Sequence, residues 1–198
     1  MKIEVRNGQA IIEGYVNVTE RMSKPIRDIR GTFIEKVEKG TFTRALEQNN
    51  NVELKFNHKR KLGDQHDGTL ELREDEVGLY AKATVNDAEV VKKAETRQLK
   101  GWSFGFSEIK SEWNKEGDSE IRSLKDILLK EVSILDIQPA YAATTISVRA
   151  NQEELLEHRA EGESNIEYDI EERSESPDKE TKKEFNKEFE EIVKKLQG

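Results

Sequence analysis

The sequence predicts an α+β protein that is mainly β, with a closed or nearly closed antiparallel β-barrel, surrounding helices and an acidic C-terminal tail. Short runs rich in β-branched and aromatic residues recur through residues 1–149, separated by turn signals. Many short strands at such spacing favour a barrel. Two stretches of this region have helical character instead, and the composition becomes polar and acidic after Arg149.

The first strands are predicted from pattern and turn chemistry. Residues 10–18 are rich in β-branched and aromatic side chains. They follow Asn7-Gly8, a pair that tolerates the positive φ angles of a hairpin turn. The polar stretch 19–32 predicts a loop, and a strand-like pattern resumes at 33–37.

Two helices are predicted within the β-rich region. Residues 40–47 are typical of a short capped helix, with Thr41 or Thr43 near its start. Residues 87–100 contain no Gly or Pro, and Asp87 is a suitable N-cap.

Later strands are predicted from alternation and apolar runs. Residues 52–56 alternate apolar and charged side chains, as a half-buried strand does. Residues 68–73 and 78–85 predict a hairpin, turning at 74–76. Further strand-like runs occupy 102–106, 109–113, 121–127 and 128–137.

The chain divides by composition into three parts. Residues 1–149 form the predicted domain, and residues 150–178 form an acidic flexible linker without strand pattern. Residues 150–198 hold 16 acidic and 8 basic residues, so they account for the formal net charge of −8. An amphipathic helix is predicted at 179–198, because apolar residues recur along one face at Phe185, Phe189, Ile192 and Leu196. Such a helix either docks on the barrel or binds a partner or a second copy.

Composition excludes several classes of function. The chain contains no Cys, which rules out disulfides, thiolate metal sites and cysteine nucleophiles. No apolar run approaches the roughly 18 residues of a membrane span. The charged, alternating residues 1–5 lack the apolar segment of a secretory signal. Balanced charge in 1–149 argues against nucleic-acid binding. We therefore expect a soluble, cytosolic protein with no membrane or nucleic-acid partner.

His58 is the first candidate for catalysis. It follows a predicted strand in Lys55-Phe56-Asn57-His58, where a rigid scaffold can present a side chain to a site. A neutral imidazole can accept a proton from a nucleophile near pH 7. The alternative is an ordinary surface histidine.

A metal site is the weaker alternative. Asp64, His66 and Asp67 are close in sequence and His58 is near, but the spacing matches no helical zinc motif. His66 is expected to be solvated in a polar turn, and His158 in the acidic tail is expected to have no partner.

Ser103 is the candidate nucleophile. It lies between Trp102 and Phe104, with Gly101 and Gly105 beyond them. Glycine allows close backbone approach and exposed N–H groups, which an oxyanion needs. The alternative is a strand serine whose hydroxyl bonds to neighbouring backbone.

A serine–histidine pair works best with a third group that orients the imidazole. Glu131 is the first candidate because it interrupts an apolar strand, where a carboxylate is either exposed or buried with a partner. Asp136 is the second candidate and Glu53 the third.

Taken together, these segments resemble the prohead protease family of tailed phages. The resemblance rests on five blocks in order across about residues 10–149: Gly14-Tyr15, Asn57-His58, Gly68-Thr69-Leu70, Ser103-Phe104-Gly105-Phe106, and Glu131-Val132-Ser133 followed by Pro139-Ala140-Tyr141.

The resemblance implies a herpesvirus assemblin-like barrel and a serine endopeptidase. It implies Ser103 as nucleophile, His58 as general base and Glu131 as third member, with Asp136 in reserve and no cofactor. It also implies that the protein acts in the host cytoplasm, inside the assembling prohead, on the major capsid protein or scaffold.

The tail suggests recruitment to scaffold or capsid, self-association, or self-cleavage within 150–178. The competing hypothesis is a non-catalytic scaffold or capsid-assembly protein on the same fold.

Overall fold

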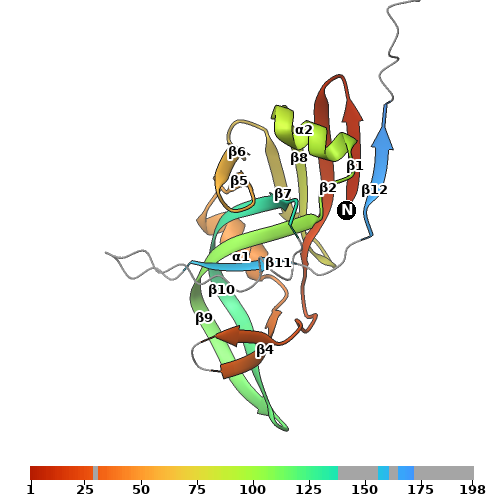
Figure 1. Ribbon diagram of the computed structural model, residues 1–198. Helices are drawn as coiled ribbons and strands as arrows, with labels where there is room; N and C mark the ends of the chain where they lie inside the picture. The colour runs from red at the N-terminus through yellow and green to blue at the C-terminus, as the bar shows by residue number, and fades with distance from the viewer. Residues whose placement is uncertain (29–30, 138–155, 161–164, 172–198) are drawn as a thin grey trace, which may run out of the picture.

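The computed structural model describes residues 1–28, 31–137, 156–160 and 165–171, which form two sheets and two helices (Figure 1). The first sheet has the strand order β12-β1-β2-β8-β7. Its strands are β1 (Lys2–Arg6), β2 (Gln9–Val18), β7 (Leu70–Glu74), β8 (Gly78–Val85) and β12 (Glu167–Ile170).

The second sheet has the order β11-β9-β10-β4-β3, and β5 joins it by pairing with both β10 and β6. Its strands are β3 (Ile26–Asp28), β4 (Gly31–Val37), β5 (Glu53–Phe56), β6 (Arg60–Asp64), β9 (Gly101–Glu116), β10 (Ser119–Leu135) and β11 (Glu157–Ala160).

Turn chemistry sets the first hairpin. Arg6 pairs with Gln9 across Asn7-Gly8, whose φ angles of 51° and 75° are the left-handed values expected of this pair. The turn predicted from these two residues is therefore confirmed.

β9 and β10 form one long curved hairpin that extends across the molecule (Figure 1). The two runs predicted at 121–127 and 128–137 are a single strand, β10. Register shifts between Leu124 and Asp126 and between Leu129 and Glu131 interrupt its pairing with β9. Such bulges bend a strand and re-aim its side chains, so one strand carries two differently patterned runs.

The helix α1 (Thr41–Gln48) begins after Gly40, which has a φ of 83° and no capping side chain of its own. Glu74 at the end of β7 supplies the missing acceptor, because its carboxylate accepts the backbone N–H groups of Gly40 at 2.8 Å and Thr43 at 2.6 Å. The predicted helix is confirmed, but neither threonine hydroxyl caps it.

The helix α2 (Ala88–Glu95) begins at the predicted cap. Asp87 accepts the N–H groups of Glu89 and Val90, both at 3.1 Å. The helix is shorter than the predicted span 87–100, because Thr96 ends it and Arg97 turns the chain with a φ of 56°. Nothing in the sequence marks this C-terminus, because the left-handed residue that ends a helix is usually glycine and here it is an arginine.

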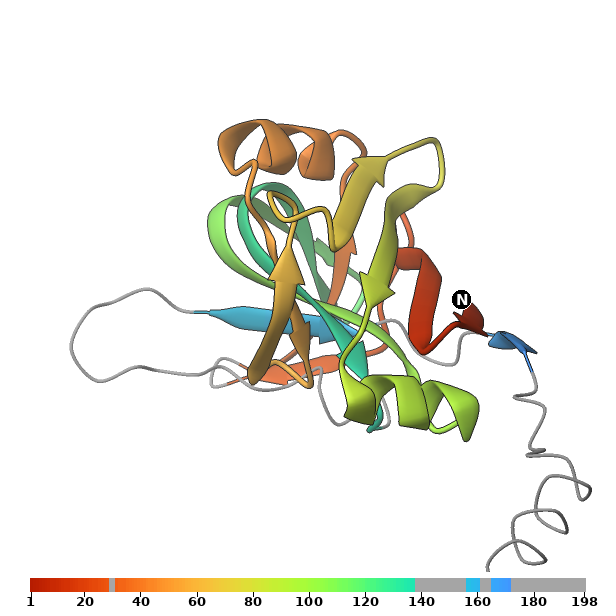
Figure 2. The ribbon, with the colours of Figure 1, turned by 90° about the horizontal axis from the view of Figure 1, so that it is seen from above.

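One hydrophobic core lies between the sheets and under both helices. Figure 2 shows the helices well apart, with strands between them. Phe42 of α1 is fully buried and meets Phe104 of β9 edge to face at 5.4 Å. Ile12 and Leu79 contribute from the first sheet, both with no exposed surface. Each such side chain stabilises the fold by about 1.5–3 kcal/mol relative to exposure.

The mainly β class with two helices is confirmed, but neither sheet closes on itself among the described residues, so the closed barrel is not confirmed. The loop predicted at 19–32 instead contains β3 and the start of β4. No helix in the described ranges is long and apolar enough to cross a membrane.

The sequence predicts no strands in residues 150–178, and this prediction is wrong for the residues of that range that the structure describes. β11 pairs with β9, and β12 pairs in parallel with β1. These short polar segments gain their main-chain hydrogen bonds from edges of preformed sheets, so an apolar alternation pattern is not needed. The amphipathic helix predicted at 179–198 lies outside the described residues.

Asp87→Ala should lower the free energy of unfolding by about 1 kcal/mol, because two N–H groups of α2 lose their acceptor. Denaturant unfolding measures the loss. Asp87→Asn, which keeps the acceptor, should stay closer to the wild type; an equal loss in both variants would instead place the effect in the ion pair with Arg60.

Candidate active site

Polar side chains gather on one face of the three neighbouring strands β11, β9 and β10. Successive side chains of a strand alternate between faces, so residues two apart share a face. Two rows of paired residues therefore lie side by side: Ala160–Ser103–Ser133 and His158–Gly105–Glu131.

A strained turn delivers His58 to this face. β5 runs parallel to β10, and the chain turns after Phe56 through Asn57 and His58, with φ values of 51° and 61°. Each left-handed residue costs of order 1 kcal/mol. The Asn57 side chain is held at both ends, because its amide donates to Asp136 Oδ1 at 2.7 Å and its oxygen accepts the Asp136 N–H at 3.2 Å.

Glu131 accepts hydrogen bonds from three side chains. Its Oε1 lies 2.5 Å from His58 Nδ1 and 3.2 Å from His158 Nδ1, and its Oε2 accepts the Ser133 hydroxyl at 2.6 Å. Only 1% of Glu131 is exposed. Burial raises the pKa of this carboxyl, but the hydrogen bonds from His158, His58 and Ser133 outweigh burial and lower the pKa to about 2.

The ionised carboxylate sets the proton position on His58. A carboxylate only accepts, so the hydrogen bond requires the proton on Nδ1. In a neutral imidazole, Nε2 then carries a lone pair. The Nε2 atom is buried and has no hydrogen-bond partner among the described residues. His58 is thus arranged to accept a proton at Nε2, and 13% of its side chain is exposed.

Ser103 is fully buried, and its hydroxyl donates to the backbone oxygen of Arg159 at 2.6 Å. A backbone acceptor is the arrangement expected of an ordinary strand serine. Ser103 lies opposite Ser133 in the register of β9 and β10. The Ser133 Oγ in turn accepts the backbone N–H of His58 at 3.1 Å. Ser103 and His58 therefore adjoin the same residue of β10.

Gly105 leaves the space in which the carboxylate and the second imidazole meet. A Cβ atom on Gly105 would lie 2.5 Å from Glu131 Oε1 and 3.0 Å from His158 Nδ1. The first distance is shorter than real Cβ contacts and the second is tighter than nearly all of them, so any side chain at this position would force Glu131 to shift.

The two other acidic candidates bind elsewhere. Asp136 accepts from Asn57 and from Lys93 at 2.7 Å, so it holds the turn that positions His58 without contacting the ring. Glu53 pairs with Lys55 at 3.1 Å and with Lys61 at 3.4 Å.

The residues of the predicted metal alternative form a turn. Asp64 Oδ1 accepts the N–H groups of His66 and Asp67, both at 3.0 Å, and Asp67 accepts that of Thr69 at 2.8 Å. These carboxylates satisfy backbone donors, and His66 is exposed, as expected. The three residues therefore do not converge on a common point.

His58, Glu131 and His158 form the one group in the described ranges whose ligand atoms could converge on a metal, lying within 4.8 Å of one another. Two ligand atoms on a tetrahedral zinc ion stand roughly 3.3 Å apart. The 2.5 Å between His58 Nδ1 and Glu131 Oε1 is a hydrogen-bond distance instead. A metal would have to displace this hydrogen bond.

Sequence reasoning named His158, Ser133 and Gly105 but missed their roles around Glu131: His158 and Ser133 are its hydrogen-bond partners, and Gly105 leaves room for its side chain. The expectation that His158 has no partner is wrong, because it contacts Glu131 and its ring centre lies 4.1 Å from that of His58, with the two ring planes tilted by 51°. The acidic composition around it concealed a strand whose partner lies more than fifty residues earlier. The available signal for Ser133 was the pattern Glu131-x-Ser133, which places two polar residues on one face of an otherwise apolar strand.

The family model of the caudovirus prohead serine protease matches residues 1–159, which include His58, Ser103, Glu131 and His158. The chain belongs to this family. It is accordingly a serine protease of phage prohead maturation. No curated protein and no solved structure gives a significant match to the chain.

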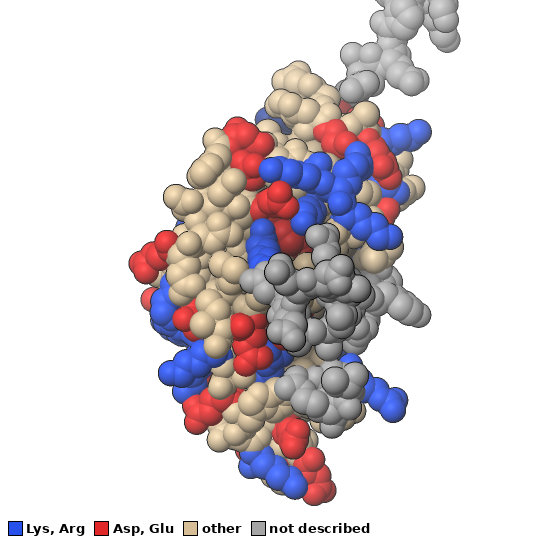
Figure 3. Space-filling view, turned by 90° about the vertical axis from the view of Figure 1, so that its left-hand side faces the viewer, with Lys and Arg blue, Asp and Glu red and all other residues tan. Residues whose placement is uncertain are grey.

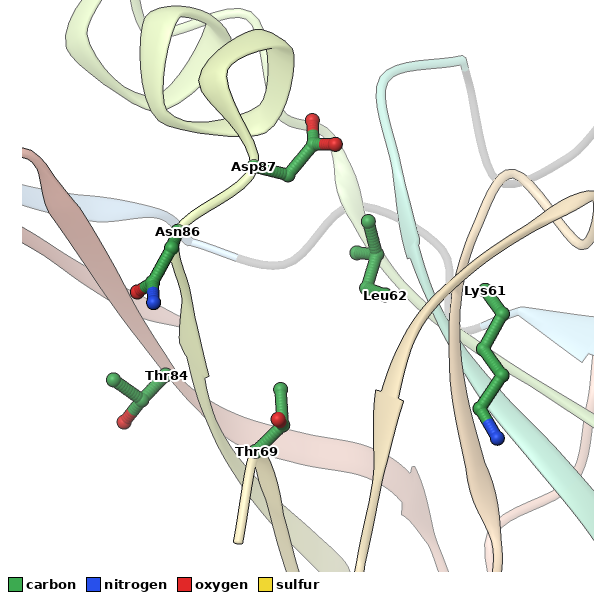
Figure 4. Close-up of a pocket in the computed structure, with 6 residues that line it drawn as sticks. All are labelled: Lys61, Leu62, Thr69, Thr84, Asn86 and Asp87. Carbon is green, nitrogen blue, oxygen red and sulfur yellow. The ribbon is translucent and has the colours of Figure 1, made fainter. Parts of the chain in front are cut away.

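A separate cleft of the protease carries none of this chemistry. It opens between β6, β8 and the start of α2, and is lined by Lys61, Leu62, Thr69, Thr84, Asn86 and Asp87 (Figure 4). Asp87 already caps α2, and no imidazole lines the cleft. Seen from the left-hand side of Figure 1, the surface carries interspersed charges of both signs (Figure 3).

Gly105→Ala should abolish proteolysis while the chain still folds, because the new methyl group displaces Glu131 from the His58 ring. Gly68→Ala is the matched control, since its Cβ meets nothing within 4 Å although its φ of 77° is strained. Activity on the capsid protein and the unfolding curve measure both variants. Full activity in Gly105→Ala would contradict the steric argument.

The lowered pKa of Glu131 predicts a pH-dependent contribution to stability. A carboxyl group whose pKa is lower in the folded state stabilises the fold at pH values above its unfolded-state pKa of 4.5. This contribution is lost as the pH falls toward the folded-state pKa of about 2. The stability difference between wild type and Glu131→Gln should therefore shrink below pH 4.5 from a maximum of about 3 kcal/mol. Urea unfolding between pH 6 and 3 measures it; a constant difference would oppose the prediction.

Proposed function

We propose that the chain is the endopeptidase that cleaves the major capsid or scaffold protein inside the assembling prohead, with Ser103 as nucleophile, His58 as general base and Glu131 as the group that orients His58. The observation that carries the proposal is the His58–Glu131 contact at 2.5 Å on the face that carries Ser103, with His58 Nε2 lacking a hydrogen-bond partner in the part of the chain that the structure describes.

The reaction would be acyl transfer. Ser103 Oγ attacks the scissile carbonyl carbon while His58 Nε2 takes its proton, and the same nitrogen then protonates the leaving amine. Water, activated by His58, hydrolyses the acyl-enzyme. Glu131 stabilises the imidazolium that forms, and the site needs no cofactor for these steps.

Ser103 is preferred to Ser133 because of where each hydroxyl proton points. Ser133 donates to Glu131 Oε2, so its proton is held by a carboxylate and its oxygen already accepts the His58 N–H. Within the described ranges Ser103 donates to one backbone carbonyl, and a rotation about its Cα–Cβ bond frees the hydroxyl.

We further propose that the protease removes its own acidic tail by cleavage within residues 150–178, and that the tail meanwhile binds scaffold, capsid protein or a second copy. The described part of this region supports the idea, because β11 brings the tail to Ser103.

Co-expression with the cognate capsid protein tests the function. Wild type should trim the capsid protein, and Ser103→Ala should reduce trimming by at least about a thousandfold. Ser107→Ala is the matched control on the same strand, because the Ser107 hydroxyl has no partner within the described residues. Intact mass spectrometry reads the products. Trimming by Ser103→Ala would refute the nucleophile, and an untouched capsid protein in all cases would favour the non-catalytic assembly protein.

A further inference from the structure

β11 lies along the edge of β9 directly beside the proposed nucleophile. Glu157 pairs with Phe106 and Ala160 pairs with Ser103, in antiparallel register. Figures 1 and 2 show this short strand crossing the middle of the molecule, and the strand order places it at the end of the sheet next to β9. An extended peptide bound to a sheet edge gains affinity from main-chain hydrogen bonds and specificity from pockets for alternate side chains.

One peptide bond of β11 is next to the nucleophile. The carbonyl oxygen of Arg159 accepts the Ser103 hydroxyl at 2.6 Å. The bond that joins Arg159 to Ala160 is therefore the bond whose carbonyl carbon is nearest to Ser103 Oγ in this contact.

The Arg159 side chain fills a pocket on the opposite face of the strands. Its Nε and Nη2 atoms donate to the two oxygens of Glu35 at 2.7 and 3.0 Å, and its guanidinium lies 5.4 Å from the centre of the Phe106 ring. Glu35 belongs to β4 and is 3% exposed. A two-pronged contact with a buried carboxylate suits the planar fork of arginine and does not suit lysine.

The buried charges around Glu35 stay balanced whether or not β11 is bound, so another peptide can replace β11. Glu35 also accepts from Arg122 Nη1 at 3.0 Å, so a buried ion pair remains within the protease when β11 is absent. β11 adds Arg159 together with Glu157, which binds Arg122 at 2.7 Å. Because the strand brings one positive and one negative charge, its binding or departure leaves no net buried charge.

We propose that this edge of β9 is the substrate-binding edge of the protease, that the pocket of Glu35 and Phe106 selects an arginine on the carbonyl side of the cleaved bond, and that β11 occupies the edge as an intramolecular substrate. The inference rests on the proposed function, because it takes Ser103 as the nucleophile. It names the substrate class: an extended peptide with arginine before the cleaved bond.

The reaction on β11 is a balanced hydrolysis. Ser103 Oγ adds to the Arg159 carbonyl carbon as its proton passes to His58 Nε2, the bond to Ala160 breaks, and the amine leaves with that proton. Water then cleaves the ester, which gives the Arg159 carboxylate and restores Ser103. In the structure the Ser103 hydroxyl points to the carbonyl oxygen, and His58 Nε2 has no partner among the residues described. The contact is therefore a resting one that also excludes other peptides.

Cleavage in trans tests the arginine preference. Full-length Ser103→Ala serves as a substrate that cannot cut itself, and the wild-type protease is added. We expect a fragment of residues 1–159 from this substrate, and at least about tenfold less from Ser103→Ala/Arg159→Leu, because the buried carboxylate loses its bidentate partner. Ser103→Ala/Arg27→Leu, which removes an exposed arginine of β3, is the matched control and should be cut like the parent.

Cleavage of the Arg159→Leu substrate at the same bond and rate would overturn the inference. So would cutting of the capsid protein without any cut after Arg159. Failure of the wild type to cut the capsid protein as well would instead count against the proposed function.

A binding measurement tests the pocket without catalysis. Full-length Ser103→Ala/Arg159→Glu places a carboxylate against Glu35 and should free the edge. The labelled peptide Leu-Glu-His-Arg-Ala-Glu should bind this variant at least about tenfold more tightly than the same peptide with Leu for Arg. Fluorescence anisotropy measures both affinities. Equal affinities, or no binding of either peptide, would overturn the proposed pocket.

Discussion

The site depends on one buried carboxylate. An isolated charge is costly to bury, and Glu131 offsets that cost with hydrogen bonds from His58, His158 and Ser133, which come from three different elements. The bulge between Leu129 and Glu131 matters here, because one extra residue decides which face a strand presents a side chain to. The same carboxylate fixes the proton on His58 Nδ1, so one buried group determines both how the strands are held and how the His58 ring is protonated.

A second group of buried charges organises the opposite face of the same strands. Arg122 is fully buried and donates to Glu35 and Glu157, and Arg159 joins both acids. The network links β4, β10 and β11, whereas the Glu131 cluster links β10, β11 and the turn that follows β5. β11 is therefore held on both faces by polar contacts and by backbone pairing along its edge. These contacts explain how a four-residue polar strand is held beside Ser103 with little apolar burial of its own.

Local signals in the sequence predicted local structure well. Asn7-Gly8 predicted the first turn and Asp87 predicted the start of α2, because each acts through its own backbone neighbours. Alternation predicted β5 and so placed His58 at a strand end. The sequence could not reveal His158 or Arg159 as part of the site, because their partners are remote and their segment lacks apolar periodicity. Sheet closure also escaped prediction, since it depends on how strands curve and pair over long separations. The roles of His58, Ser103 and Glu131 stay predictions, although His58 and Glu131 are in contact and Ser103 lies on the same face.

The protonation state of the His58 ring tests the central claim most directly. Long-range ¹⁵N–¹H correlation spectra of the full-length protease near neutral pH distinguish the two ring tautomers, and His66→Gln and His158→Gln variants identify the His58 signals. The account predicts a proton on Nδ1 and a bare Nε2 in the wild type, with this preference lost in Glu131→Gln. A proton found on Nε2 in the wild type would contradict the account, because His58 could not then take a proton from a serine.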